Sequence, residues 1–101
     1  MMLNNFTEVQ IMKIQETLER LHDCNIRQGS DCKIENIKMF KDDKDNFYMS
    51  YVSTSFADGS PNPKIMYIEI DTEGSKIILN DEYKAQENLI AKFETLTAIK
   101  L

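Results

Sequence analysis

The segment KIMYIEIDTEGSKIILN, residues 64–80, constrains the fold more than any other part of the chain. Two isoleucine-rich runs flank the turn TEGS, in which Gly74 can adopt a positive φ, so we predict a β-hairpin. Side chains alternate between the two faces of a strand, yet apolar residues occur here at successive positions. The hairpin therefore carries apolar side chains on both faces, and a fold that contains it must cover both or leave one as a contact surface.

Two further strand-like runs precede this hairpin. CKIENIKMF, residues 32–40, has apolar residues of mixed parity, so either Asn36 forms a β-bulge or the strand begins late. The polar residues KDDKDN suit a hairpin loop, and FYMSYVSTSF, residues 47–56, is rich in aromatic and β-branched residues. Two prolines then predict a rigid surface loop over residues 57–63, because proline cannot donate a backbone hydrogen bond.

The first of two predicted helices has clear signals at both ends. Thr7 and Gln10 fit a capping box, and Gly29 suits the position that follows a helix. Apolar residues between them recur at spacings of three and four, which predicts one buried stripe. The residues of this stripe are Ile11, Ile14, Leu18 and Leu21.

A second helix is predicted from Asn80 or Asp81 through about residue 97. Its apolar stripe consists of Leu89, Phe93 and Leu96, with Ile90 alongside. The tail TLTAIKL also alternates as a strand does, so a strand is the alternative there.

The order of helix, four strands and helix predicts an α+β fold. We expect a two-layer sandwich, in which a four-stranded antiparallel meander carries the N-terminal and the C-terminal helix on one face. A length of 101 residues is that of one ordinary domain, so residues 1–101 are expected to form a single domain.

Charge and targeting patterns narrow the function classes. The formal net charge of −5 is spread along the chain without a basic stripe, so we expect no nucleic-acid partner. The first residues do not fit a secretory signal, and no run approaches the roughly 20 apolar residues of a membrane span. We therefore expect a cytoplasmic protein without a membrane partner. The bias toward Ile, Lys and Asn favours an AT-rich genome, bacterial or phage.

Cys24 and Cys32 are the only cysteines of the chain. Two reduced thiols are expected, and a disulfide between the end of the first helix and the first strand is the alternative. With His22 as the single histidine, these residues predict no zinc site, and we expect no metal and no cofactor.

No motif of nucleotide-binding, metalloprotease or serine-hydrolase chemistry occurs in the chain, so we do not expect an enzyme. Asp42, Asp43 and Asp45 fit a charged hairpin tip better than a calcium loop. An EF-hand loop requires glycine at its sixth position, where this chain has Phe47.

With both helices on one face, the other face of the sheet is predicted to be bare, aromatic and β-branched, as protein contact surfaces are. The predicted binding residues are Tyr48, Val52, Phe56, Ile65, Tyr67 and Ile78, with Asp58 and Asn62 at the rim. One alternative is a sheet without a partner, since such cross-strand pairs themselves contribute about 0.2 to 1 kcal/mol each. The other is a helix that crosses to this face.

We therefore predict a small non-enzymatic protein-binding module with an inhibitor, immunity or chaperone-like role. Its partner is expected to be another protein or a second copy of the chain, as a homodimer, bound through the sheet face or edge. The alternative is a small-ligand-binding domain or minor enzyme, whose pocket between sheet and helices would draw polar contacts from Tyr51, Tyr83 or His22.

Overall fold

The computed structural model describes residues 6–26, 32–56, 59–80, 93 and 95–99. These residues form a helix and a five-stranded antiparallel sheet, so the predicted α+β class is confirmed. The elements are α1 (Glu8–Ile26), β1 (Cys32–Lys41), β2 (Phe47–Ser55), β3 (Asn62–Ile70), β4 (Lys76–Asn80) and β5 (Thr97–Ala98). In the sheet order β4-β3-β2-β1-β5, the first four strands lie beside their neighbours in sequence and β5 lies outside β1.

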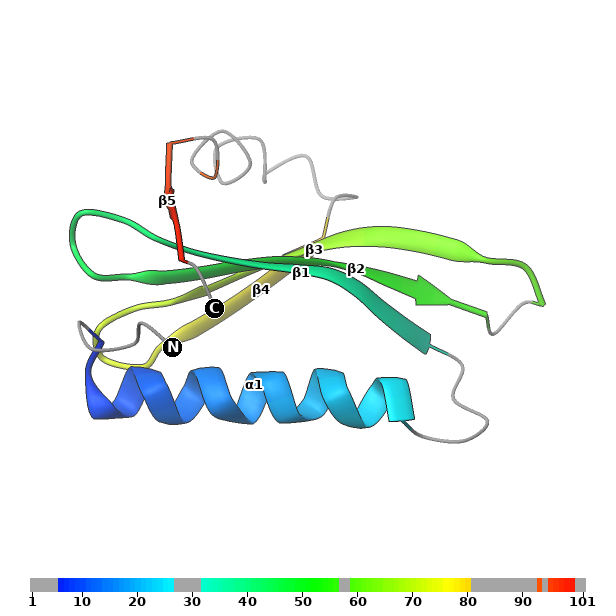
Figure 1. Ribbon diagram of the computed structural model, residues 1–101, viewed down its shortest axis with the longest axis horizontal. Helices are drawn as coiled ribbons and strands as arrows, with labels where there is room; N and C mark the ends of the chain where they lie inside the picture. The colour runs from blue at the N-terminus through cyan, green and yellow to red at the C-terminus, as the bar shows by residue number, and fades with distance from the viewer. Residues whose placement is uncertain (1–5, 27–31, 57–58, 81–92, 94, 100–101) are drawn as a thin grey trace.

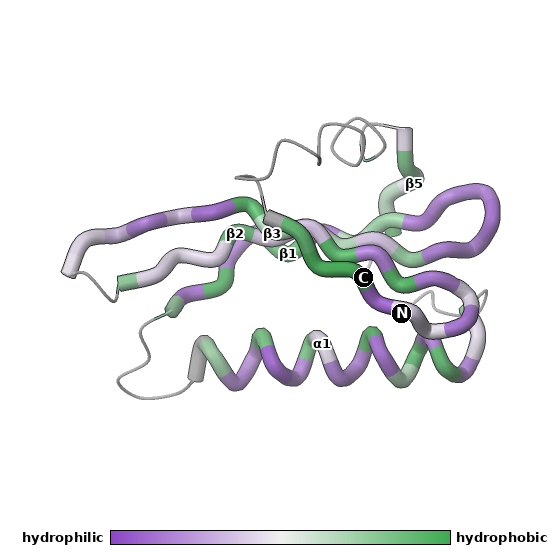
Figure 2. The backbone as a smooth tube through the Cα atoms, turned by 180° about the vertical axis from the view of Figure 1, so that it is seen from behind, coloured by the Kyte–Doolittle hydropathy of each residue, from purple (hydrophilic) through white to green (hydrophobic). Residues whose placement is uncertain are grey.

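α1 covers one face of the sheet (Figure 1), and hydrophilic and hydrophobic stretches alternate along it in Figure 2. Ile14 and Leu21 are buried, and Ile11 and Leu18 pack against the same core, which confirms the predicted stripe. The sheet contributes Ile34, Met39, Phe47, Met49, Tyr51, Ile68 and Ile70 to this core. Removal of these side chains from water is the main force that holds the two layers together.

The start of α1 is fixed by hydrogen bonds to two hairpin turns. The Gln10 Oε1 accepts from the Thr7 backbone N–H (2.8 Å), and the Thr7 Oγ1 accepts from the Gln10 N–H (3.2 Å), which confirms the capping box. The Nε2 of the buried Gln10 also donates to the carbonyl of Asp45 (2.8 Å), and the Thr7 hydroxyl donates to the carbonyl of Thr72 (2.9 Å). The capping residues thus attach the helix to the β1–β2 and β3–β4 turns.

A β-bulge in β1 decides which of its side chains reach the core. The pairing of β1 with β2 shifts between Glu35 and Lys38, and Asn36 has a φ of 55°. The extra residue allows Ile34 and Met39, which an odd number of positions separates, both to face α1. Of the two alternatives for this strand, the bulge at Asn36 is the observed one, and it explains the mixed parity.

The last described residues form a strand where the sequence analysis extended a helix through residue 97. Thr97–Ala98 pair with residues 40–41 of β1 as β5, and the N–H of Ile99 donates to the carbonyl of Met39 (2.9 Å). This pairing satisfies backbone N–H and C=O groups at the edge of β1. The strand alternative for this tail is thus the observed one at β5.

Phe93 lies on the face of the sheet opposite α1, where the prediction placed both helices on one face. Its ring packs against Tyr48 and Tyr67, which alternate along their strands with the core residues Met49 and Ile68. Phe93 therefore lies on the second side of the sheet. Most of the predicted second helix, residues 81–92, lies outside the described residues.

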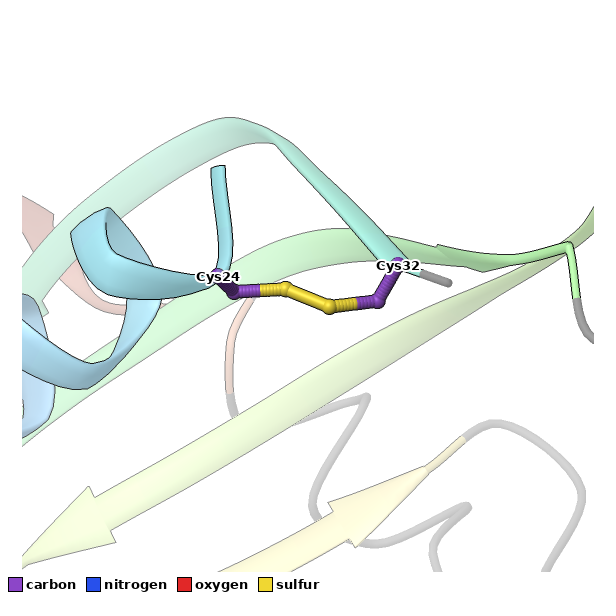
Figure 3. The surroundings of a disulfide bond; sticks show 2 residues. All are labelled: Cys24 and Cys32. Carbon is purple, nitrogen blue, oxygen red and sulfur yellow. A yellow bond between two sulfur atoms is a disulfide. The ribbon is translucent and has the colours of Figure 1, made fainter. Parts of the chain in front are cut away.

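A disulfide joins Cys24, near the end of α1, to Cys32, the first residue of β1 (Figure 3). The two Cα atoms are 6.4 Å apart, which is within the usual range for a disulfide. The expected pair of reduced thiols is therefore not observed, and the disulfide that was the alternative is present. The bridge fixes the end of α1 beside the start of β1.

The β3–β4 turn comes into close contact with α1. The Asp71 Oδ1 accepts from the N–H groups of Glu73 and Ser75, both at 2.9 Å, and Gly74 has a φ of 86°. A Cβ atom on Gly74 would overlap the side chain of Val9. Glycine is therefore required here both by the turn and by the approach of the helix.

We expect Gly74→Ala to lower the free energy of unfolding by about 2 to 5 kcal/mol, because left-handed strain adds to the overlap with Val9. Gly59→Ala is the matched control. Gly59 has a φ of 78°, but no heavy atom of the described chain beyond its neighbours lies within 4 Å of the added Cβ. Its expected loss is about 1 to 2 kcal/mol. Urea denaturation measures both, and equal losses would show that α1 does not press on this turn.

Candidate functional site

The sheet face turned away from α1, here termed the second face, is the candidate site. Directly opposed residues of antiparallel strands have side chains on the same face, so the strand register defines its membership. Tyr48 lies between Phe40 and Glu69, and Tyr67 pairs with Leu79. The apolar residues of β1–β4 on the second face are Phe40, Tyr48, Val52, Ile65, Tyr67, Ile77 and Leu79.

Phe93 covers the aromatic part of the second face. Its ring centroid lies 5.5 Å from that of Phe40, 5.6 Å from Tyr48 and 5.1 Å from Tyr67, each in edge-to-face geometry. The exposed fractions of Tyr48 and Tyr67 are accordingly 0% and 9%. The predicted exposure of these two tyrosines is wrong, because Phe93 lies on this face and not on the α1 side.

Ile78 lies on the opposite face from the one predicted. It pairs with the core residue Ile68 and therefore faces the α1 side, whereas Ile77 and Leu79 lie on the second face. The turn over residues 71–75 fixes this register. Alternation within a strand shows which residues share a face but not how that strand aligns with its neighbour, so the sequence pattern grouped Ile78 incorrectly.

The other predicted residues lie at three kinds of position. Val52 and Ile65 are paired on the second face, where Val52 is half-buried and Ile65 is 41% exposed. Phe56 follows the end of β2 and Asn62 begins β3, and both are exposed. Asp58 lies outside the described residues. Val52 and Ile65 are thus the predicted pair that is both on the second face and accessible.

A hydrogen-bonded group closes the turn end of the second face. The Asp42 carboxylate accepts from the N–H groups of Lys44 and Asn46 and from the Asn46 side-chain amide, each at 2.9 Å, and from the Tyr48 hydroxyl at 3.0 Å. Burial opposes ionisation of Asp42, but these hydrogen bonds outweigh it and lower its pKa below 3.8. Asp42 therefore holds the β1–β2 turn. Among the described residues, no group of three or more acidic, cysteine or histidine side chains is arranged to hold a metal ion.

The Tyr48 hydroxyl is kept protonated by its surroundings. Burial raises its pKa above 10, and the hydrogen bond to Asp42 and the negative charges of Glu69 and Asp42 raise it further. A phenol of this kind donates a hydrogen bond and does not release its proton near neutral pH. The polar group at this end of the second face thus stabilises the turn.

A hollow of about 690 Å³ lies between the β1–β2 turn and residues 95–97. It is lined by Lys41, Asp42, Asp43, Lys44, Asp45, Asn46, Thr95, Leu96 and Thr97. The residues considered for a small-ligand site lie elsewhere: Tyr51 is buried in the core beneath α1, and His22 is exposed on α1. Tyr83 lies outside the described residues. The structure does not bring Tyr51 and His22 together at this hollow.

The outer edge of β4 was not singled out by the sequence analysis. Within the described part of the chain, no strand pairs with β4 on the side away from β3, and Ile77 and Ile78 are 52% and 48% exposed. Lys76 does not guard this edge, because its Nζ donates to the Thr17 hydroxyl of α1 at 3.1 Å. A bare apolar edge is a template for another strand. The sequence feature that could have indicated this edge is the run of three apolar residues, Ile77, Ile78 and Leu79, in the last strand of the predicted meander.

The opposite edge of the sheet is protected. β5 pairs with the end of β1, the bulge at Asn36 interrupts the strand, and Lys33 forms an exposed ion pair with Glu35 at 3.5 Å. Bulges and charged side chains are devices by which proteins prevent unwanted edge pairing. The two edges are therefore built differently, and among the described residues β4 is the edge strand without a neighbour on its outer side.

Comparison with protein-family models, with curated proteins and with solved structures finds no match to this chain. None of the helical segments that the structure describes combines the length and the apolar composition needed to cross a membrane. The second face and the β4 edge are thus the features from which function can be inferred.

Phe93→Ala is expected to lower the free energy of unfolding by about 2 to 4 kcal/mol, because it removes ring contacts to Phe40, Tyr48 and Tyr67. It should also expose the tyrosines to solvent, as near-ultraviolet difference spectra measure. Phe56→Ala is the control, since Phe56 is 39% exposed and is expected to cost less than about 1 kcal/mol. Unchanged tyrosine spectra in Phe93→Ala would contradict the covering role of Phe93.

The lowered pKa of Asp42 predicts that the protein loses stability in acid. Because its pKa is lowered on folding, the unfolded chain binds more protons below pH 3.8, and the stabilisation is lost as pH falls through the folded-state pKa. Urea unfolding between about pH 5 and pH 2 should therefore show a smaller decline for Asp42→Asn than for the parent. Asp43→Asn is the control, because Asp43 accepts none of the hydrogen bonds that hold the turn. A decline in Asp42→Asn as steep as that of the parent would show that Asp42 does not carry the effect.

Proposed function

We propose that this chain is a small non-enzymatic protein-binding module that works through the β4 edge and the accessible part of the second face beside it. The observation that carries the proposal is the bare edge, where Ile77 and Ile78 are half exposed and no described strand pairs outside β4. An inhibitor, an immunity protein or a chaperone-like protein would use this edge by adding a strand of its partner to its own sheet.

The edge offers both affinity and specificity. Unpaired backbone groups of an edge strand supply hydrogen bonds to an added strand, and its alternate side chains supply the contacts that distinguish one partner from another. Ile77 and Leu79 continue the second face toward Tyr67 and Ile65. A strand paired with β4 would therefore extend the apolar surface of the second face instead of ending it.

The polar residues of the second face favour binding over catalysis. Asp42 and Tyr48 hydrogen-bond to each other at 3.0 Å, and their pKa values are shifted away from neutrality in opposite directions. A general acid or base works best with a pKa near the working pH. These two residues are thus better suited to hold the turn than to transfer a proton.

The proposed compartment is the cytoplasm, as the sequence predicts. The disulfide between Cys24 and Cys32 opposes this, because disulfides persist mainly in oxidising compartments. The bridge spans a sequence separation of 8 residues, so the chain-entropy model gives it about 2 to 3 kcal/mol. The core between α1 and the sheet is formed mainly by other side chains, and we propose that the reduced protein also folds and binds.

Affinity capture with wild-type and Ile77→Lys baits tests the proposal, using the cytoplasmic fraction of the organism that carries the gene and identification by mass spectrometry. We expect a partner, which includes the chain's own copy, to be retained about tenfold better by the wild type, because an edge lysine opposes strand pairing. Met12→Lys is the matched control, since Met12 is exposed on α1. It should retain the partner.

Equal retention by the wild-type and Ile77→Lys baits would contradict a role for the β4 edge. Loss of the partner in Met12→Lys as well would indicate a general effect of added charge and would also count against the edge. A partner found in a secreted fraction and not in the cytoplasmic one would contradict the proposed compartment.

A further inference from the structure

The backbone of β4 presents a symmetric set of hydrogen-bonding groups at its outer edge. In the β3–β4 turn the N–H of Asp71 donates to the carbonyl of Ser75 at 3.0 Å, so these two residues form a hydrogen-bonded pair. Hydrogen-bonded and non-hydrogen-bonded pairs alternate along an antiparallel ladder, so every second residue of β4, beginning with Ile77, bonds to β3. The backbone N–H and C=O groups that point outward are consequently those of Lys76, Ile78 and Asn80.

From this symmetry we propose that the partner of the β4 edge is β4 of a second copy of the chain, paired antiparallel about a two-fold axis at Ile78. The inference rests on the proposed function, because it uses the same edge. The axis places Ile78 opposite its own copy and Lys76 opposite Asn80 of the other chain, so every outward-pointing backbone group gains a partner. The two five-stranded sheets then form one continuous sheet.

The side chains are self-complementary in this register. On the second face, Ile77 of each copy lies opposite Leu79 of the other, and on the α1 side the two Ile78 side chains meet at the axis. Ile77 and Ile78 are 52% and 48% exposed in the single chain. Pairing removes this apolar surface from water on both faces at once, which favours the dimer.

Charge disfavours two alternative registers. Lys76 is the only charged residue in the sequence of β4, KIILN. Antiparallel pairing about Ile78 separates the two Lys76 positions by about 13 Å along the strands. Parallel pairing in register would set the two lysines side by side, as would an antiparallel register centred on Lys76, and like charges directly opposed are unfavourable. The bond from Lys76 to Thr17 also directs its ammonium group toward α1 and away from the new contact.

The small size of the contact predicts a weak dimer. β4 has 5 residues, and interfaces that bury less than roughly 1,200 Å² belong to the weak or transient class. We therefore expect monomer and dimer to exchange, with the dimer dominant only at protein concentrations on the order of 0.1 mM and above.

Sedimentation equilibrium over roughly 5 µM to 1 mM tests the pairing, a range chosen for a weak interface. The average mass of the wild type should rise from the monomer toward twice that value. Ile78→Lys should stay monomeric, because it places two lysines against each other at the axis. Ile37→Lys is the matched control: Ile37 is 37% exposed but lies on β1, on the side of the sheet away from β4, so this variant should still dimerise. Circular dichroism verifies that each variant is folded.

A mixture of Ile78→Lys with Ile78→Glu provides the decisive comparison. Each variant alone should remain monomeric, and the mixture should form a heterodimer, because a two-fold axis at residue 78 opposes these two positions. A mixture that stays monomeric would overturn the proposed register.

A wild-type chain that remains monomeric up to about 1 mM would overturn the inference. The proposed function would survive that result if a different protein is still captured in a manner that depends on Ile77. Loss of the dimer in Ile37→Lys to the same extent as in Ile78→Lys would show that the contact does not depend on β4, and it would likewise overturn pairing at the edge.

Discussion

A sheet with apolar side chains on both faces needs a cover on each, and this requirement organises the described structure. α1 covers one face with its apolar stripe, and Phe93 covers the aromatic centre of the other through contacts to Phe40, Tyr48 and Tyr67. Burial of these large apolar side chains favours this arrangement. What is left exposed is the margin, around Ile65 and the β4 strand, and not the centre of the second face.

The two layers are held in register by one buried amide. The Gln10 Nε2 lies between the carbonyls of Asp45, at 2.8 Å, and Ile70, at 3.4 Å, so it joins the start of α1 to the β1–β2 turn and to the end of β3. A buried polar group without a partner would cost about 1 to 3 kcal/mol, so these bonds favour one position of the helix over others. Helix capping and tertiary packing are therefore coupled at this residue.

Local features could be predicted from the sequence, while features that depend on distant contacts could not. The capping box and the bulge at Asn36 are set by residues within a few positions of one another, and both are observed. The face of Ile78 depends on how a turn aligns two strands, which alternation within one strand does not reveal. The burial of Tyr48 and Tyr67 depends on Phe93, far away in sequence, and on a crossing that an amphipathic stripe cannot specify. The candidate site was predicted at the centre of the second face, whereas the exposed apolar side chains of Ile77 and Ile78 lie on the edge strand β4.

The position of α1 explains why Ile78 stays half exposed. Thr7 ties the start of the helix to Thr72 in the β3–β4 turn, and Cys24 ties its end to Cys32 at the start of β1. Since β1 begins at the end of the sheet opposite the two turns, a helix with these two attachments runs from the β4 side at one end toward the β1 side at the other (Figure 1). It lies near the first residue of β4, which reaches α1 through its side chain, and then departs from that strand. The half-exposed state of Ile78 is thus a consequence of where the helix is anchored.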